Sequence, residues 1–200
     1  MSNLYLDIET YKGPTAPDLS TIEAPANYKD PDKIAAYKLE KQAEDWKRQA
    51  LVSHRGRIVC AGFARGDDPV TVVTGDEPTI LSAVYDVMHF ADNFVGHNVG
   101  FDLLFLAHRG LAHGIKIHSR IETKKWDKNY TDTMELASFG LQWKYYISLA
   151  DLCELLGIEK PWGSGDEVAA WYDAGDIDSI VKHCKSDIEA TREVYKRLTR

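Results

Sequence analysis

The chain has 200 residues, of which 44% are hydrophobic and 28% are charged, so we expect one folded α/β domain and exclude a disordered chain. It shows no signal peptide, no apolar run long enough to span a bilayer and no Cys-x-x-Cys pair among Cys60, Cys153 and Cys184; this excludes a membrane partner and a zinc site and favours the cytoplasm. The net charge of −7 argues only weakly against a nucleic-acid partner, because bound cations and basic loops act locally.

The first predicted element is a strand over residues 4–10, and it carries the first candidate site. Apolar and polar side chains alternate along it, so Asp7 and Glu9 share a face and lie roughly 6.5–7 Å apart. Two carboxylates this close raise each other's pKa unless a cation lies between them, and Mg²⁺ prefers carboxylate oxygens. The pair therefore indicates a metal site, although Asp-x-Glu is also common on a solvated strand face.

An irregular, proline-rich segment over residues 10–31 follows the strand. Residues 32–51 then place apolar side chains at helical spacing among charged ones. They predict an amphipathic helix inserted between the first two strands, which would either cover the core or lie beside the substrate.

The middle of the chain predicts alternating strands and helices. Short β-branched runs at residues 57–64 and 70–74, separated by Gly-Asp-Asp-Pro, predict a hairpin. A helix over residues 78–90, a strand over 93–97 and an apolar helix over 101–108 follow. This order favours a mixed sheet with helices on its faces.

Asn98 and Asp102 bracket the start of the apolar helix. Asn98 can serve as a helix cap, and an aspartate is favourable near a helix N-terminus. Asp102 lies among Phe101, Leu103 and Leu104, which predict a buried helix. A buried aspartate is costly unless it is paired or binds a metal, so Asp102 is a second candidate ligand.

Residues 109–128 are basic, with six Lys and Arg residues against two acidic ones, and Trp126 and Tyr130 are interleaved with them. Single-stranded nucleic acid is bound by such combinations, with phosphates on cations and bases on rings. Lys124 and Lys125 are the candidate contacts. A solvated loop whose two rings pack into the core explains the pattern equally well.

Regular structure is predicted again toward the C-terminus. Asp132 or Thr133 is a candidate cap for a short helix over residues 134–139. Two further helices are expected, one over residues 149–157, where a glycine ends it, and one from residue 168.

The last predicted helix, over residues 178–200, carries His183 and Asp187 four residues apart on one flank of its apolar stripe. A pair with this spacing is more often a surface pair than a site, so by itself it does not indicate chemistry.

The three patterns together resemble the motifs of the DEDD 3′–5′ exonucleases, in the ribonuclease-H-like superfamily. Asp-x-Glu at residues 7–9, Asn-x-x-Phe-Asp at 98–102 and His-x-x-x-Asp at 183–187 stand in that family's order. Residues 132–137 and 148–153 also resemble its connecting segments. The chain is most similar to the proofreading domains of family B DNA polymerases and to their stand-alone relatives, which are often encoded by bacteria or phages.

This resemblance implies an α/β fold, a ribonuclease-H-like mixed five-stranded sheet with helices on both faces. The whole chain, residues 1–200, would form a single exonuclease domain with a partly helical insertion at about residues 11–54. Two Mg²⁺ or Mn²⁺ ions would be held by four carboxylates: Asp7, Glu9, Asp102 and Asp187. Contacts with the terminal nucleotide would come from three residues: Thr10, Asn98 and Phe101.

One position departs from the family pattern. The tyrosine subtype has Tyr-x-x-x-Asp, and the histidine subtype places four residues between His and Asp. His183 combines the spacing of the first subtype with the side chain of the second. It would orient the attacking water or accept its proton, since a free imidazole pKa near 6.5 suits neutral pH. The alternative is a partly exposed helix residue beside Cys184.

The expected activity is hydrolysis of single-stranded or frayed 3′ ends by two-metal catalysis, with DNA favoured and a DNA polymerase as a partner in trans. Two alternatives stay open. One is a 3′–5′ exoribonuclease on the same fold, which a 2′-hydroxyl contact would distinguish. The other is a non-catalytic module that binds a polymerase or nucleic acid, and the four retained carboxylates argue against it.

Overall fold

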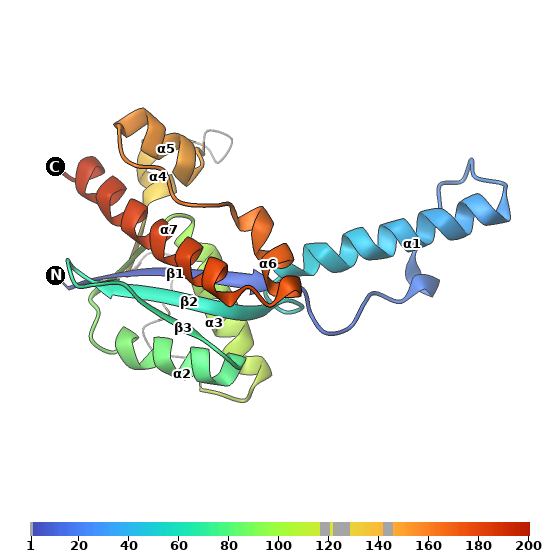
Figure 1. The fold of residues 1–200 in the computed structure, drawn as a ribbon, viewed down its shortest axis with the longest axis horizontal. Coiled ribbons are helices and arrows are strands. Elements are labelled where there is room, and N and C mark those ends of the chain that lie inside the picture. Colours follow the sequence, from blue (N-terminus) through green and yellow to red (C-terminus); the bar gives the residue numbers. More distant parts are fainter. Residues whose placement is uncertain (1, 117–120, 122–128, 142–145) are drawn as a thin grey trace.

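The computed structural model describes residues 2–116, 121, 129–141 and 146–200, and a five-stranded sheet forms its centre (Figure 1). The strands are β1 Asn3–Tyr11, β2 Arg57–Arg65, β3 Thr71–Thr74, β4 Asn93–Gly96 and β5 Tyr130–Asp132. Their order across the sheet is β3-β2-β1-β4-β5. The β1–β2 and β2–β3 pairs are antiparallel, whereas β1–β4 and β4–β5 are parallel. The expected mixed five-stranded sheet is confirmed.

Helices cover both faces of this sheet (Figure 1). The helices of the chain's described part are α1 Pro31–Arg48, α2 Glu77–Met88, α3 Val99–Ala112, α4 Thr133–Ala137, α5 Leu149–Leu156, α6 Val168–Ala174 and α7 Ile177–Leu198, of which α1 does not lie on the sheet. Short 3-10 turns lie at Leu19–Thr21, Gln49–Leu51 and Gly165–Glu167. Within the described part of the chain, no helix combines the length and hydropathy needed to cross a bilayer.

The alternation predicted along β1 divides the core into two layers. Leu4, Leu6 and Ile8 belong to the apolar cluster that includes residues of α2 and α3. Tyr5 and Tyr11 belong to the cluster that includes residues of α6 and α7. A strand whose two faces are both buried lies at the centre of its sheet, as the pattern of β1 predicts.

Two predicted helix ends are fixed by the residues expected there. Asp132, rather than Thr133, caps α4, because its Oδ1 accepts the N–H of Met134 at 2.9 Å. Gly157 ends α5 in the left-handed region, with φ of 64°. These local signals therefore predict where α4 begins and where α5 ends.

Helix α1 is present as predicted, but it projects from the body of the protein as an arm (Figure 1). None of its residues is buried, so the interpretation that this helix covers the core is wrong. The preceding extended segment packs along it, and the indole of Trp46 donates a hydrogen bond to the carbonyl of Gly13 at 2.8 Å. At the base of the arm, the hydroxyl of Thr10 donates to the carbonyl of Ala50 at 2.6 Å.

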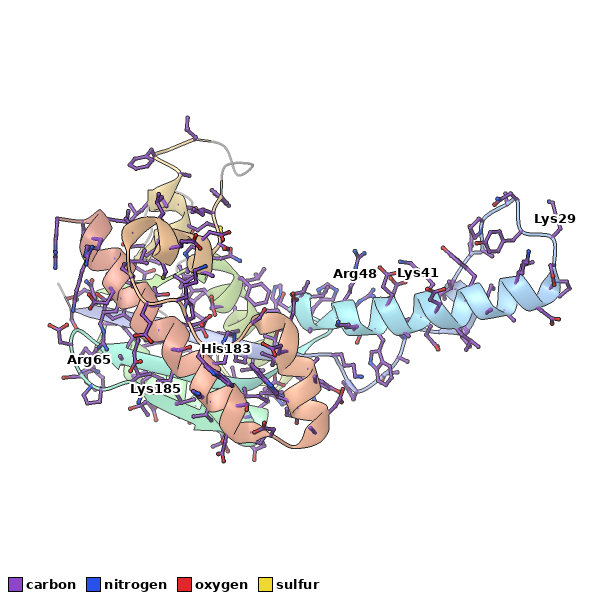
Figure 2. All side chains as sticks on the ribbon, turned by 45° about the horizontal axis from the view of Figure 1, so that its top comes forward. Lys29, Lys41, Arg48, Arg65, His183 and Lys185 are labelled. Atoms are coloured by element: carbon purple, nitrogen blue, oxygen red, sulfur yellow. The ribbon has the colours of Figure 1, made fainter. Side chains whose placement is uncertain are left out.

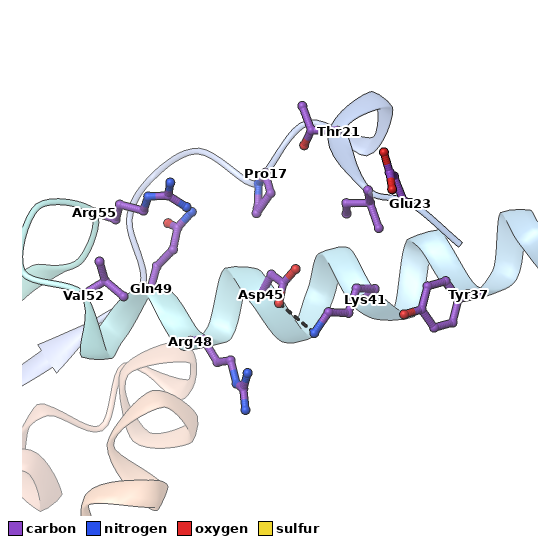
Figure 3. Close-up of a pocket in the computed structure, with 11 residues that line it drawn as sticks. Pro17, Thr21, Glu23, Tyr37, Lys41, Asp45, Arg48, Gln49, Val52 and Arg55 are labelled. Carbon is purple, nitrogen blue, oxygen red and sulfur yellow. Dashed lines mark ion pairs between the residues drawn. The ribbon is translucent and has the colours of Figure 1, made fainter. Parts of the chain in front are cut away.

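Figure 3 shows the hollow between the arm and the segment that precedes it. An ion pair of 3.0 Å between Lys41 and Asp45 lies along its wall. None of the residues that line this hollow is one of the four candidate metal ligands.

Candidate active site

The candidate site forms where β1 continues past the end of β4. Strand β4 pairs with β1 only over Asn3–Tyr5. Farther along β1, the side chain of Asp102 takes the place of a strand partner, and its Oδ1 accepts the backbone N–H of Ile8 at 2.9 Å. The first turn of α3 is thereby attached to the part of β1 that carries the first acidic pair.

Four carboxylates converge at this edge of the sheet. They are Asp7 and Glu9 from β1, Asp102 from α3 and Asp187 from α7. The four negative charges are close enough to repel one another. For any two of these carboxylates, the repulsion raises the pKa of at least one of the two. One ligand atom each from Asp7, Glu9 and the Cys184 thiol lie within 4.8 Å of one another. The structure thus brings together the four acidic residues that the sequence motifs single out.

Burial is the largest cause of the raised pKa of each of these carboxyls, and repulsion between the neighbours adds to it for Asp7, Glu9 and Asp102. Burial raises the pKa of Asp187 to about 6, although the nearby imidazole of His183 lowers it. A carboxyl that resists ionisation in this way is stabilised as an anion when a cation is bound beside it.

The oxygens of this cluster fit a hard divalent cation. Two buried carboxylate oxygens, Asp7 Oδ2 and Asp187 Oδ1, accept no hydrogen bond from any described residue. A buried acidic oxygen without a partner is costly, and a metal ion removes that cost. Mg²⁺ and Mn²⁺ are bound through such carboxylates, so the donor set suits the ions that the resemblance implies.

Cys184 lies against the carboxylates but stays a thiol. Its hydrogen bond with Cys60 and its burial raise its pKa well above the usual value, and the charge of Asp7 raises it further. Its Sγ lies 3.8 Å from the carbonyl oxygen of Asp7, to which the S–H donates. A protonated thiol is a poor ligand for hard cations, so the ligand set consists of carboxylates.

His183 lies inside the site, between two of the carboxylates. Its side chain is 5% exposed, with Nε2 3.6 Å from Glu9 Oε1 and Nδ1 3.5 Å from Asp187 Oδ1. Nδ1 also lies 2.7 Å from the carbonyl oxygen of Trp162. Because a carbonyl only accepts, Nδ1 carries a proton, and in the neutral ring Nε2 is the acceptor. The alternative of a partly exposed helix residue is therefore wrong.

Asn98 does not cap α3. Its backbone is left-handed, with φ of 65°, and its side chain makes no capping hydrogen bond. Instead, its N–H donates to Oδ1 of Asp132 at 2.8 Å. The side chain of Asn98 is exposed, and the charge of Asp132 also raises the pKa of Asp102.

The other predicted nucleotide contacts are distributed unevenly. Thr10 is half-buried at the base of the arm, and Phe101 is half-buried with its ring centroid 4.8 Å from that of Phe105. Lys124 and Lys125 lie outside the described residues. Leu104, expected in the core, is 51% exposed. Two residues turn a helix by about 200°, so a buried Asp102 directs Leu104 to solvent.

Two residues that contact the site were not recognised in the sequence. Trp162 holds the ring of His183 through its backbone carbonyl. Every residue has such a carbonyl, so the residue type does not predict this contact. Asp132 was recognised only as a helix cap, although its second hydrogen bond positions Asn98 at the start of α3.

Comparisons with known proteins identify the family of this chain. Residues 54–200, which include Asp102, His183 and Asp187, match the family described as predicted 3′–5′ exonucleases related to the exonuclease domain of PolB. The uncharacterised protein MJ0365 of Methanocaldococcus jannaschii is 29% identical over an alignment 153 residues long, and the match covers 71% of this chain and 85% of that protein.

A solved structure shares the fold. The family B DNA polymerase from the hyperthermophilic archaeon Pyrobaculum calidifontis aligns with a TM-score of 0.66 and 17% identity. The alignment covers 99% of this chain and 24% of the polymerase, so the chain spans about a quarter of that protein's length. At this identity the likeness shows the fold alone.

Proposed function

The chain belongs to the family of predicted 3′–5′ exonucleases related to the exonuclease domain of PolB, and on this premise we propose that it is an active, metal-dependent exonuclease acting on the 3′ end of DNA. One observation carries the proposal: four carboxylates from three elements meet around a buried histidine, with Glu9 and Asp102 buried and Asp7 and Asp187 half-buried. Mutual repulsion among buried acids costs folding free energy, so a simple scaffold has no reason to contain them.

Asp7, Glu9, Asp102 and Asp187 are proposed to hold two Mg²⁺ or Mn²⁺ ions. Bound ions of this kind lower the pKa of a coordinated water and neutralise the charge that develops on the attacked phosphate and the leaving 3′ oxygen. The oxygens of Asp7 and Asp187 that accept no hydrogen bond from any described residue support this assignment.

The protein's own groups are arranged for positioning and proton transfer. The N–H of Ile8 orients Asp102 before any ligand arrives, which reduces the cost of ordering it. The carbonyl of Trp162 holds the imidazole of His183 so that Nε2 accepts the proton of the attacking water. Burial of the cluster lowers the local dielectric constant and strengthens each of these interactions.

The substrate is proposed to be single-stranded DNA or a frayed duplex end, and the likeness to a DNA polymerase supports DNA over RNA. Thr10, Asn98 and Phe101 are proposed to contact the terminal nucleotide. The 200 residues are proposed to form one exonuclease domain with an insertion at about residues 11–54, which includes the arm. A DNA polymerase acting in trans is the proposed partner.

The test is hydrolysis of 5′-labelled single-stranded DNA, duplex DNA with a mismatched 3′ end, and RNA, each with Mg²⁺, with Mn²⁺ and with excess chelator. Stepwise shortening from the 3′ end of DNA is expected only with metal. Asp7→Asn should be inactive, whereas Asp67→Asn, whose side chain is 83% exposed, should match the wild type. Wild-type protein that is inactive on every substrate, or active in excess chelator, would overturn the proposal. If the protein hydrolyses RNA faster than DNA, RNA is the substrate instead of DNA.

A further inference from the structure

The geometry points to a nucleotide-binding position beside His183, formed by the indole of Trp162 and the ammonium of Lys182. A base of the substrate strand stacks on the indole, and a neighbouring phosphate pairs with the ammonium. This inference rests on the proposed function, because it takes a single strand of nucleic acid as the substrate. It adds two contacts that none of the three sequence motifs contains.

Hydrogen bonds attach the backbone of Trp162 to α7 at the candidate catalytic residue. The backbone N–H of Trp162 donates to Oγ of Ser186 at 2.9 Å, and its carbonyl accepts from the imidazole Nδ1–H of His183 at 2.7 Å. Oγ of Ser186 in turn donates to the carbonyl of His183 at 2.8 Å. The distance between Trp162 and the imidazole is therefore set by directed bonds rather than by loose packing.

A second ring supports the indole from one side. The Trp162 and Trp171 rings are stacked, with centroids 5.3 Å apart and planes 15° apart, and the Trp171 centroid lies 5.8 Å from that of His183. Gly163 makes this approach possible, because a Cβ at that position would lie 2.7 Å from Trp171. Despite this support, Trp162 stays 39% exposed. A rigid, exposed indole is the surface on which unpaired bases stack.

Lys182 supplies the cation. Its Nζ lies 4.0 Å from the centroid of Trp162, and it forms no ion pair with the carboxylates that the structure describes. Lys185, one turn farther along α7, instead has Glu189 at 4.0 Å. The ammonium stands on a flexible stem, so it can move to a phosphate while a base takes its place over the ring. In a chain of net charge −7, such a cation beside the acidic cluster favours binding of a polyanion.

The test is a scan of the substrate with abasic nucleotides. Dissociation constants are measured by fluorescence anisotropy for single-stranded DNA with one abasic position at each of the terminal nucleotides in turn, with Ca²⁺ and phosphorothioate linkages to slow hydrolysis. Wild-type protein should lose affinity at one position, by roughly 5- to 150-fold, the usual range for one stacked base. Trp162→Ala should lose a similar factor on intact DNA and nothing further on the abasic strand.

Conservative and charge variants separate stacking from structure. Trp162→Phe keeps a ring and the backbone bonds, so it should retain the position-specific loss in weakened form. Lys182→Gln should leave that loss in place but reduce the slope of log affinity against log salt by about one unit or less.

Matched controls exist elsewhere in the chain. Phe90 is 68% exposed, and the guanidinium of Arg65 lies 5.3 Å from its ring centroid. Arg65 pairs with the start of β1, at the opposite end from Glu9, and Figure 2 shows it away from His183. Phe90→Ala and Lys185→Gln should both bind as the wild type does.

The outcomes separate this inference from the proposed function. Wild-type protein that hydrolyses DNA but shows no position-specific loss, or Trp162→Ala that retains that loss, would overturn the inference alone. Position-specific, Trp162-dependent binding without hydrolysis by the wild type would overturn the proposed function alone. An absence of binding would overturn both, and a Trp162→Ala variant that fails to fold leaves the wild-type scan and Trp162→Phe to decide.

Discussion

The backbone N–H of Ile8 donates to Oδ1 of Asp102 at 2.9 Å, although 94 residues separate the two in sequence. The bond satisfies a backbone donor of the central strand beyond the last residue that pairs with β4. It also fixes the orientation of a carboxylate in the candidate metal site. We therefore expect one interaction to contribute to both stability and activity, and the two effects can be measured separately.

We expect Asp102→Asn and Asp102→Ala to be equally inactive but unequally stable. The amide oxygen of Asn can still accept the Ile8 N–H, whereas Ala leaves this buried donor unpaired, at a cost of about 1–3 kcal/mol. Urea unfolding without metal measures the difference. Equal free energies of unfolding for the two variants would show that the bond does not stabilise the fold.

Mg²⁺ and Mn²⁺ should raise the melting temperature as well as permit activity. A ligand bound only by the folded state adds about 2.7 kcal/mol at a concentration one hundred times its Kd. Asp7→Asn should lose both effects and keep its fold by circular dichroism, while Asp67→Asn, at an exposed position, should keep both. If these ions leave the melting temperature of the wild type unchanged, the metal assignment is contradicted.

His183→Ala should separate binding from chemistry. Metal and oligonucleotide affinity should stay close to the wild type, while kcat falls by roughly 10²–10⁴-fold, the usual contribution of a general base. His183→Tyr should recover part of this loss, because it restores the residue that the tyrosine subtype has at this spacing. Rates are to be compared at saturating Mg²⁺. A kcat equal to that of the wild type in the alanine variant would show that His183 has no role in the chemical step.

Glu77 is expected to make stability dependent on pH. Its carboxylate accepts bonds from Arg109 at 2.8 and 2.9 Å, from the N–H of Ile58 at 2.7 Å and from His113 at 2.6 Å. Burial raises its pKa, but the bonds from Arg109 and Ile58 outweigh this and hold the pKa below 4.5. The folded state therefore binds fewer protons in this window, so the stabilisation is present above about pH 4.5 and is lost as pH falls through the folded pKa.

Glu77→Gln should consequently cost about 1–3 kcal/mol at neutral pH. The difference from the wild type should shrink as the pH is lowered from neutral through the folded-state pKa of Glu77, because protonation then removes the same charge from the wild type. Guanidinium unfolding of both proteins at neutral pH and at acidic pH measures this difference in the free energy of unfolding. A difference that is equal at the two pH values would show that the charge of Glu77 is not involved.

The basic segment over residues 109–128 remains a predicted contact with the strand. Replacing Lys124 and Lys125 with alanine should raise KM more than it lowers kcat. The salt dependence of binding should become shallower by about one unit or less for each lost phosphate contact. Wild-type affinity and salt slope in the double variant would identify the segment as a solvated loop.

The sequence by itself predicted the four carboxylates that the structure brings together and most of the elements that hold them. The alternation along β1 predicted a central strand with Asp7 and Glu9 on one face, and Gly157 predicted the end of α5. These features follow from periods of two or about 3.6 residues and from single caps, which a local pattern records.

Only the tertiary structure decided how those residues meet. The burial of His183, its bond to the carbonyl of Trp162 and the bond between Ile8 and Asp102 join segments far apart in the chain. The direction of the arm was likewise decided only by the tertiary structure. The pattern of α1 predicted an apolar stripe, but it did not predict which part of the protein packs against that stripe. Long-range packing and backbone acceptors depend on where other segments lie, and neither residue type nor local period encodes that position.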